Sequence, residues 1–259
     1  MIGSPRIKLL DTAIIGGGGV GTAITWDIDA TDGRSYPQSA ATWTDFIAYH
    51  SLSAPVPDHL HLCQEASGNL IDVIGADDLI QGGTGHTYEN AVSGLSRLGV
   101  IAVNSATYWS STAYNPASTS QFTLMIISHS VATNRYFYQY GNNANIATRV
   151  YFAGNSLTVV SSGGVSGAAS PSGLHPVGAQ HDRTDSSGAW VVDPDQKVVT
   201  TRASPSLAQT TVGGIPSAGT TVGTMVYIAR WIGADAEAMT PTVVKAMLQA
   251  MGWTITYTP

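Results

Sequence analysis

From Asp58 onward, short apolar runs alternate with clusters of turn-forming residues. Each run has the length of one strand, and the clusters between runs are rich in Gly, Asn, Asp, Ser and Pro, the residues that turns favour. The runs read HLHLCQ, SRLGVIAV, FTLMIISH, RYFYQYG, TRVYFAG, SLTVVSS, AWVVDP, KVVTTR and TMVYIARWIG. This pattern predicts an all-β domain over residues 58–259, with its strands connected as a meander or a Greek key.

A segment near the C-terminus has the period of a helix instead. Thr240 can cap its N-terminus, Pro241 fits its first turn and Gly252 can end it. Its apolar positions recur at helical spacing, at Val244, Met247, Leu248 and Met251. We expect this side of the helix to pack on the sheets, while Lys245 and Gln249 face water.

Residues 1–57 differ in composition from the rest of the chain. They contain a Gly run, scattered Asp residues and the Pro-bounded stretch SLSAPVPDH, which is typical of a linker. We interpret them as an N-terminal arm that lies outside the sandwich core and contacts another chain. Gly16, Gly18 and Gly21 match the dinucleotide-binding motif in letters, but the strand-prone stretch TAITW follows where that motif needs a helix. Nucleotide binding is therefore not expected.

Composition and charge remove several classes of partner. Only 11% of the residues are charged, and the net charge is -6 with no run of Lys or Arg. This leaves no basic surface for nucleic acid or an anionic membrane. No apolar stretch is long enough to span a bilayer, and the N-terminus lacks the hydrophobic part of a signal peptide, so we expect synthesis in the cytoplasm. The single Cys63 excludes an internal disulfide.

Three motifs, taken in order, resemble the laminin-G-like domains of the concanavalin A-like lectin and glucanase superfamily. HLCQEASGNLID, residues 61–72, resembles their opening strand and turn. PVGAQHDR, residues 176–183, and AWVVD, residues 189–193, resemble their paired strands, although Asp193-Pro-Asp195 replaces the usual Asp-Gly of the hairpin. VYIARW, residues 226–231, with the helix after it, resembles the family's last strand. The resemblance implies a two-sheet antiparallel jelly-roll β-sandwich with a short C-terminal helix.

Catalytic carboxylates are the test for an enzyme, because many members of this superfamily cleave polysaccharides. Those enzymes place them at alternating positions of one strand, as Glu-x-Asp-x-x-Glu, and this array is absent. Asp27 and Asp29 alternate but lie in the arm, and Asp193 and Asp195 flank a proline on a turn. A G-x-S-x-G nucleophile motif is absent too. We therefore expect no enzymatic activity.

His59, His61 and Cys63 alternate, so all three point to one face of their strand. This spacing could ligate zinc, but no fourth ligand is evident. We expect Leu60 and Leu62 to pack inward, which leaves the histidines solvated or in a subunit contact.

Calcium is the one cofactor that the resemblance implies, since these sandwiches often hold Ca²⁺ in loops through carboxylates and carbonyls. The candidate ligands form one cluster: Asn69, Asp72, Asp77 and Asp78. The acid that the family often places near the start of its last strand is missing here. Asp residues that only cap turns explain the same cluster.

Aromatic rings that could stack on sugars form the last candidate site, with polar side chains that could fix hydroxyl groups. The candidates are Tyr108, Trp109, Tyr114, Asn115, Tyr136, Tyr138 and Tyr140. Core or interface packing explains these residues as well. Trp190 and Trp231 lie within apolar strands and are expected in the core.

Two functions fit this sequence. The first is a non-enzymatic structural or attachment protein, such as a phage virion, fibre or decoration component, whose N-terminal arm docks on other chains of the assembly. The second is a free lectin-like module that binds carbohydrate. A polysaccharide-degrading enzyme is a distant third, and the fold class alone does not choose among the three.

Overall fold

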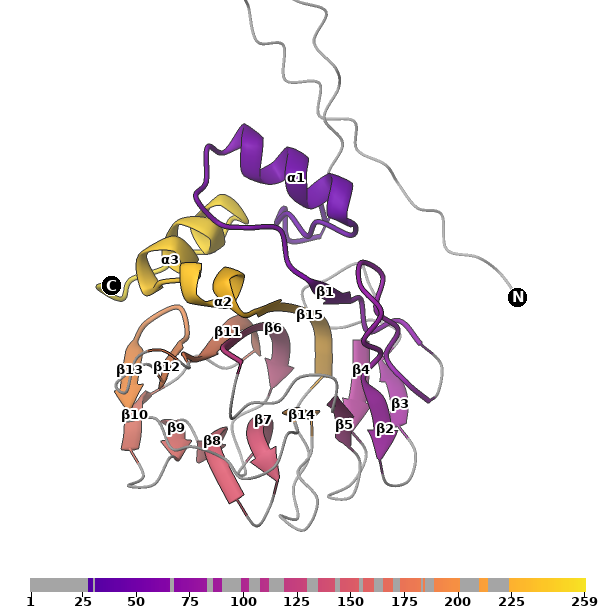
Figure 1. Ribbon diagram of the computed structural model, residues 1–259, viewed down its shortest axis with the longest axis vertical. Coiled ribbons are helices and arrows are strands. Elements are labelled where there is room, and N and C mark those ends of the chain that lie inside the picture. The colour runs from indigo at the N-terminus through magenta and orange to yellow at the C-terminus, as the bar shows by residue number, and fades with distance from the viewer. Residues whose placement is uncertain are drawn as a thin grey trace, which may run out of the picture.

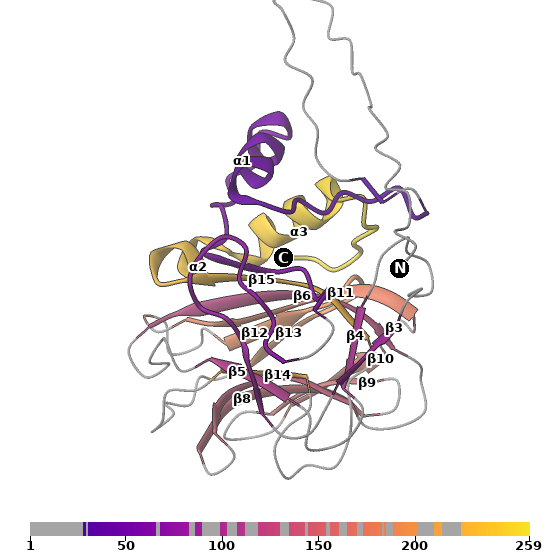
Figure 2. The same ribbon diagram turned by 90° about the vertical axis from the view of Figure 1, so that its right-hand side faces the viewer.

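The structure is a computed structural model. It describes residues 28–29, 31–65, 68–82, 86–89, 99–102, 108–111, 119–129, 135–142, 145–153, 156–160, 165–169, 173–182, 184, 189–200, 210–213 and 224–259. Two antiparallel sheets lie face to face, and helices cover the outer side of one of them (Figure 1, Figure 2). The predicted jelly-roll β-sandwich with a short C-terminal helix is confirmed.

Three nine-residue strands lie side by side in the middle of the eight-stranded sheet. Its order is β13 (Lys197–Thr200), β12 (Ala189–Val192), β11 (Gly173–His181), β6 (Gln121–His129), β15 (Thr224–Ile232), β4 (Gly99–Ala102) and β3 (His86–Glu89). Strand β1 (His59–His61) also pairs with β15. The predicted pairing of residues 176–183 with 189–193 is confirmed as β11 and β12.

The seven-stranded sheet lies opposite. Its order is β10 (Val165–Ala169), β9 (Ser156–Val160), β8 (Asn145–Ala153), β7 (Arg135–Asn142), β14 (Thr210–Gly213), β5 (Tyr108–Ser111) and β2 (Ile80–Gly82). Every apolar run named from the sequence contains a strand of one sheet or the other. The short strands β2, β3, β5, β10 and β14 lie outside those runs, so the hydrophobic pattern did not predict them.

Among the described side chains, the largest hydrophobic cluster lies between the eight-stranded sheet and the helices. Phe122 and Leu124 of β6 and Trp231 of β15 belong to it, together with residues of α1 (Ala40–Tyr49), α2 (Ala234–Ala238) and α3 (Pro241–Ala250). Figure 2 shows these helices as a layer above that sheet. Trp190 and Trp231 are buried, as expected.

Helix α3 confirms the predicted capping and packing. The Thr240 side chain accepts a hydrogen bond from the backbone N–H of Val243, and Gly252 ends the helix at φ +97°, in the left-handed region that glycine tolerates. The predicted apolar face, Val244, Met247, Leu248 and Met251, is fully buried. The expectation that Lys245 faces water is wrong. Its Nζ donates to the Tyr257 carbonyl at 2.7 Å, and the residue is half-buried. Gln249 is exposed, as predicted.

Helix α1 corrects the interpretation of the N-terminal arm. Ser39 caps this helix in a reciprocal pair with Thr42, and Trp43 and Phe46 are fully buried. The Trp43 ring meets Trp231 of β15 edge-on, with centroids 5.8 Å apart. Residues 31–57 therefore contribute to the core, and the expectation that the whole arm lies outside it is wrong for them. The domain boundary at residue 57 stays a prediction, and the Gly16–Gly21 motif lies outside the described residues.

The inner face of the eight-stranded sheet carries buried polar side chains among apolar ones. Gln121, Thr123, His175, His181 and Arg230 are all buried there, with at most 2% of each exposed. In the strand register, Arg230 of β15 lies between Thr123 of β6 on one side and His59 of β1 on the other. The candidate site lies at this end of the sheet.

Among the described residues, no helix is long and apolar enough to cross a membrane.

Candidate functional site

The site is built where the segment 68–82 folds over the three-residue strand β1. Isolated bridges join His61 to Asp72 and Leu70 to Leu79, and the Val73 N–H donates to the Leu60 carbonyl at 2.8 Å. The segment then continues into β2 of the other sheet. It therefore ties the edge of one sheet to the edge of the other.

A glycine makes this close packing possible. A Cβ atom on Gly75 would lie 2.5 Å from Nδ1 of His59 and 2.7 Å from Oδ2 of Asp72, closer than real Cβ contacts. Only a residue without a side chain lets the backbone approach these two groups. The packing of this loop on β1 therefore requires glycine at position 75.

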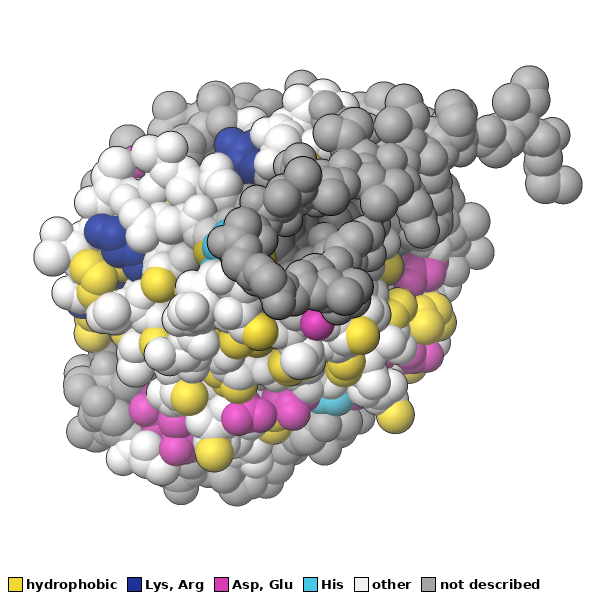
Figure 3. Space-filling model, turned by 90° about the horizontal axis from the view of Figure 1, so that it is seen from above, with side chains coloured by type: hydrophobic (Ala, Val, Ile, Leu, Met, Phe, Trp, Pro, Cys, Tyr) yellow, Lys and Arg dark blue, Asp and Glu magenta, His cyan; other side chains and the backbone are white. Residues whose placement is uncertain are grey.

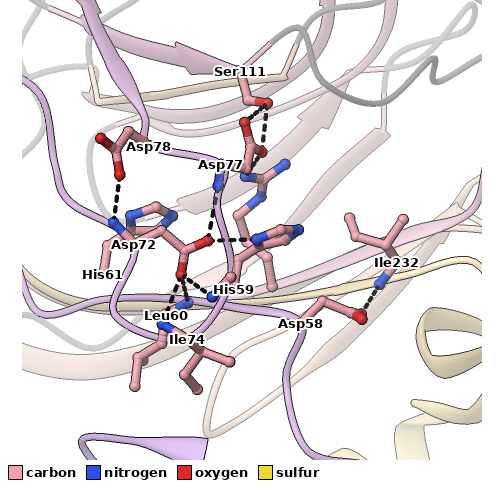
Figure 4. Close-up of polar contacts among 12 residues, drawn as sticks. Asp58, His59, Leu60, His61, Asp72, Ile74, Asp77, Asp78, Ser111 and Ile232 are labelled. Atoms are coloured by element: carbon pink, nitrogen blue, oxygen red, sulfur yellow. Dashed lines mark hydrogen bonds and ion pairs between the residues drawn. The ribbon is translucent and has the colours of Figure 1, made fainter.

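Asp72 is the hub of the site (Figure 4). Its oxygens accept hydrogen bonds from His59 Nδ1 (2.6 Å) and from the backbone N–H groups of Leu60 (3.0 Å), Ile74 (3.1 Å), Gly75 (2.9 Å) and Asp77 (3.1 Å). Burial acts to raise the pKa of this carboxyl, but the hydrogen bonds from His59 and the backbone outweigh it and hold the pKa well below its usual value. Asp72 is thus an anion bound by β1 and by its own loop.

Asp77 connects the two sheets. Nη1 of Arg230, on β15, lies 2.7 Å from Asp77 Oδ2, and the Ser111 hydroxyl, on β5, donates to the same carboxylate at 2.6 Å. Arg230 is fully buried and Asp77 nearly so. Figure 4 shows the Ser111 side chain directed at the Asp77 carboxylate. This is a buried ion pair whose charge-assisted bonds span the sandwich.

His61 is buried and neutral. Its Nδ1 lies 3.2 Å from the Leu70 carbonyl, which can only accept, so the ring proton is on Nδ1. Burial first, and then the charge of Arg230, lower the pKa of His61 to about 4. The expectation of solvated histidines on β1 is wrong, because the segment 68–82 covers that face: His59 is 4% exposed, and His61 and Cys63 are 0%.

The predicted calcium ligands lie in one loop but do not converge. Asn69 accepts from the Gln81 N–H, Asp78 accepts from the Asp72 N–H, and Asp72 and Asp77 are occupied as described above. The described residues hold no group of three His, Cys, Asp or Glu side chains placed for one metal ion. As arranged, these residues do not fit a calcium ion or a zinc ion, and calcium binding stays an untested prediction.

The predicted sugar-stacking residues separate. Trp109 is fully buried and its Nε1 donates to the Gly68 carbonyl at 3.0 Å, so its ring offers no face to a sugar and it belongs to the core. Tyr108 is half-buried, with its ring against Gly82, its register partner on β2. Tyr114 and Asn115 lie outside the described residues. Of Tyr136, Tyr138 and Tyr140, only the backbone, in β7, is described.

Other carboxylates have local roles or were missed. Asp193 accepts from the N–H groups of Asp195 and Gln196, which makes the predicted turn. The Ser120 hydroxyl lies 2.7 Å from a Glu237 oxygen and 3.5 Å from an Asp182 oxygen, which brings two carboxylates together from α2 and the end of β11. Sequence reasoning could not find this pair, because its members are far apart in the chain and no motif links them.

Comparisons with known proteins identify the fold only. No protein-family model and no curated protein matches the chain. Trypanosoma rangeli sialidase in complex with sialic acid matches with a TM-score of 0.51 and 11% identity, over 80% of this chain and 38% of the sialidase. The binding domain of botulinum neurotoxin serotype D/C matches with a TM-score of 0.49 and 8% identity, over 75% of this chain and 52% of that one.

A third solved structure is domain 4 of an extracellular arabinanase from Geobacillus stearothermophilus in complex with arabinotriose. Its TM-score is 0.44 and its identity 12%, over 64% of this chain and 82% of that domain. The chain spans less than two thirds of the sialidase and neurotoxin chains. These matches do not establish the laminin-G-like family, which stays a prediction.

Proposed function

We propose that this chain is a non-enzymatic structural or attachment protein, a component of a virion or another particle surface that carries a lectin-like β-sandwich. One observation supports this most: the polar cluster around Asp72 and Asp77 holds strands of the two sheets together. Asp72 and Asp77 point to β1, β5 and β15 and are at most 8% exposed. A catalytic acid or base has to reach a substrate, and these carboxylates are bound by the protein itself.

The attachment role assigns docking to the N-terminal arm. Residues 31–57 pack on the sheet, so residues 1–27 are the part we propose to contact neighbouring chains. Figure 3 shows the face over the helices, where the described Asp and Glu side chains form a band along the lower edge and Lys and Arg occupy a few spots. Mixed charge of this kind suits a protein partner better than nucleic acid.

Carbohydrate binding is the second candidate function. The sialidase structure, whose match covers 80% of this chain, is a complex with sialic acid. Tyr108 is half-buried, on the strand next to the edge strand β2 of the seven-stranded sheet. We assign Tyr108 as the first residue to test. A glycan array probed with the wild-type chain, Tyr108→Ala and the control Tyr49→Ala, which changes an exposed tyrosine on α1, gives the answer. Signal lost only in Tyr108→Ala supports a lectin-like module.

Particle size and turnover test the main proposal. Light scattering of the full chain and of a chain lacking residues 1–27 should show assembly that depends on the arm, with both proteins folded. Polysaccharides incubated with the full chain should remain intact. Hydrolysis abolished by Asp182→Asn or by Glu237→Gln would overturn the non-enzymatic assignment, because these two carboxylates share a hydroxyl partner.

A further inference from the structure

Three buried polar side chains form a diagonal row on the inner face of the eight-stranded sheet. Thr123 of β6 lies directly opposite Arg230 of β15. His61 of β1 lies opposite Ile228, two residues from Arg230 and on the same face. Arg230 and His61 are 0% exposed and Thr123 is 1% exposed. The row therefore borders a part of the interior between the two sheets.

Four polar atoms of this row have no hydrogen-bond partner in the described structure: Nε and Nη2 of Arg230, Nε2 of His61 and Oγ1 of Thr123. Buried polar atoms are nearly always paired in proteins, since an unpaired one bears its full desolvation cost. Nε and Nη2 form one edge of the guanidinium, with two N–H groups aimed in parallel. Asp77 binds only Nη1.

The chemistry of these atoms selects their ligand. The Arg230 edge needs an acceptor, whereas Nε2 of His61 needs a donor because the ring proton faces the Leu70 carbonyl. A second carboxylate or phosphate is disfavoured, since Asp77 already neutralises Arg230 and Asp72 adds another negative charge. A metal cation would be repelled by the guanidinium. An O–H group satisfies both requirements.

We propose that Arg230, His61 and Thr123 line a buried hydration site, in which ordered water accepts from Arg230, donates to His61 and bonds the Thr123 hydroxyl. Together these atoms supply two N–H donors, one nitrogen acceptor and one hydroxyl, the kinds of partner that buried water needs. It goes beyond the proposed function, because it adds water to the Asp77 bridge as a link inside the sandwich. The low pKa of His61, about 4, agrees with a neutral ring that accepts.

A high-resolution crystal structure of the full chain tests the site. We expect water oxygens at about 2.7–3.2 Å from Nε or Nη2 of Arg230 and from Nε2 of His61. Thr123→Val keeps the shape and removes the hydroxyl, so it should displace at least one of these waters, whereas the control Met125→Leu on the same face should displace none. Density for any larger molecule, or a dry interior with these atoms paired to protein groups, overturns the proposal.

Two measurements on the wild-type chain cover the case in which Thr123→Val does not fold. Nitrogen-15 NMR of His61 should show the proton on Nδ1 and an accepting Nε2, and water should give cross-relaxation to the ring. Native mass spectrometry should show no added mass beyond solvent. A proton on Nε2, or a co-purified small molecule lost in Arg230→Lys, contradicts the hydration site.

Discussion

At the scale of single residues, Asp72 controls how β1 is held. One carboxylate accepts hydrogen bonds both from β1 and from its own loop, so its charge matters at each contact. Replacing Asp72 by Asn keeps the shape but turns an acceptor into an amide that faces N–H donors. We expect a loss of about 1.5–3 kcal/mol in the free energy of unfolding, the range for hydrogen bonds to a charged group.

Urea unfolding measures this loss. The matched control is Asp45→Asn on the exposed side of α1, which should change the stability by no more than about 0.5 kcal/mol. Equal midpoints for the two variants would show that the Asp72 hub is not formed in solution.

His61 gives the stability a defined pH dependence. Its pKa is about 4 in the folded chain and about 6.5 when unfolded, so the folded chain resists protonation that the unfolded chain accepts. The stabilisation is complete above pH 6.5 and is lost as the pH falls toward 4. Between pH 7.5 and 5 we expect a loss of about 2 kcal/mol. The Asp72 contribution, with its lowered pKa, is lost only at more acidic pH.

The check is urea unfolding of the wild-type chain and of His61→Asn at both pH values. Asn can still donate to the Leu70 carbonyl but does not titrate, so the variant should lose less stability between pH 7.5 and 5. Identical pH slopes would rule out a buried neutral His61. Other titrating groups are common to both proteins and cancel.

The sequence identified the residues of this cluster but not their arrangement. Spacing and residue type mark four of them as candidate metal ligands: His59, His61, Asp72 and Asp77. The alternation in β1, however, predicts one apolar and one solvated face. In the structure both faces are buried, because a segment later in the chain covers the second one. Period alone cannot predict a cover that comes from elsewhere in the chain.

At the scale of elements, α1 is the strongest test of how the N-terminal segment is used. Trp43 is fully buried against Trp231, so Trp43→Ala should cost about 3–5 kcal/mol through the cavity it leaves. Thr44→Ala, at the next and exposed position, should cost far less. Thermal or urea unfolding compares the two, and similar losses would mean that α1 is not docked.

Deletion extends the same argument to the whole segment. Removing residues 1–57 would expose the apolar face that Trp43 and Phe46 cover, so we expect loss of the cooperative transition, the opposite of what an independent arm predicts. The signals for α1 were in the sequence: Ser39 as a cap, and apolar residues three and four positions apart after it. The Gly and Pro residues on either side of this segment favour a linker, which is why the sequence pattern did not predict the helix.

The C-terminal helix α3 allows a sharper comparison. Leu248 is fully buried, so Leu248→Ala should cost about 2–5 kcal/mol. The appropriate control is Gln249→Ala, because Gln249 is exposed whereas Lys245 bonds the Tyr257 carbonyl. Both changes leave helix propensity nearly unchanged. Equal melting temperatures for the two variants would mean that α3 does not pack on the sheet.

At the scale of the whole molecule, the two faces of the eight-stranded sheet differ in the side chains they bury. Its outer face packs against the helices through apolar side chains, while its inner face buries Arg230 and other polar residues beside apolar ones such as Met125. Composition predicted a large apolar core but not that the helices build part of it on the outer face of this sheet. That depends on α1 and α3 returning to the same face from opposite ends of the chain.

The bridge from Arg230 through Asp77 to Ser111 therefore should couple the two sheets. Asp77→Asn leaves a fully buried guanidinium without its carboxylate, and Arg230→Met leaves a buried carboxylate without its cation, so each should cost about 3–5 kcal/mol. The double variant removes both charges and should lose clearly less than the two separate losses together. The coupling free energy, from urea unfolding of the four proteins, is the measurement.

The control cycle uses Asp32 and Arg34, an ion pair within one turn whose arginine side chain is 28% exposed. Both members of that pair belong to one turn and the arginine is partly solvated, so their coupling should be about 0–1 kcal/mol. The stacking of Arg34 on Trp253 does not involve Asp32 and cancels in the cycle. Coupling for Asp77 and Arg230 no larger than for the control would show that the charges do not join the sheets. A large coupling, combined with Ser111→Ala weakening the same transition, would place the junction of the sandwich at these three residues, since Ser111 reaches Asp77 from the opposite sheet.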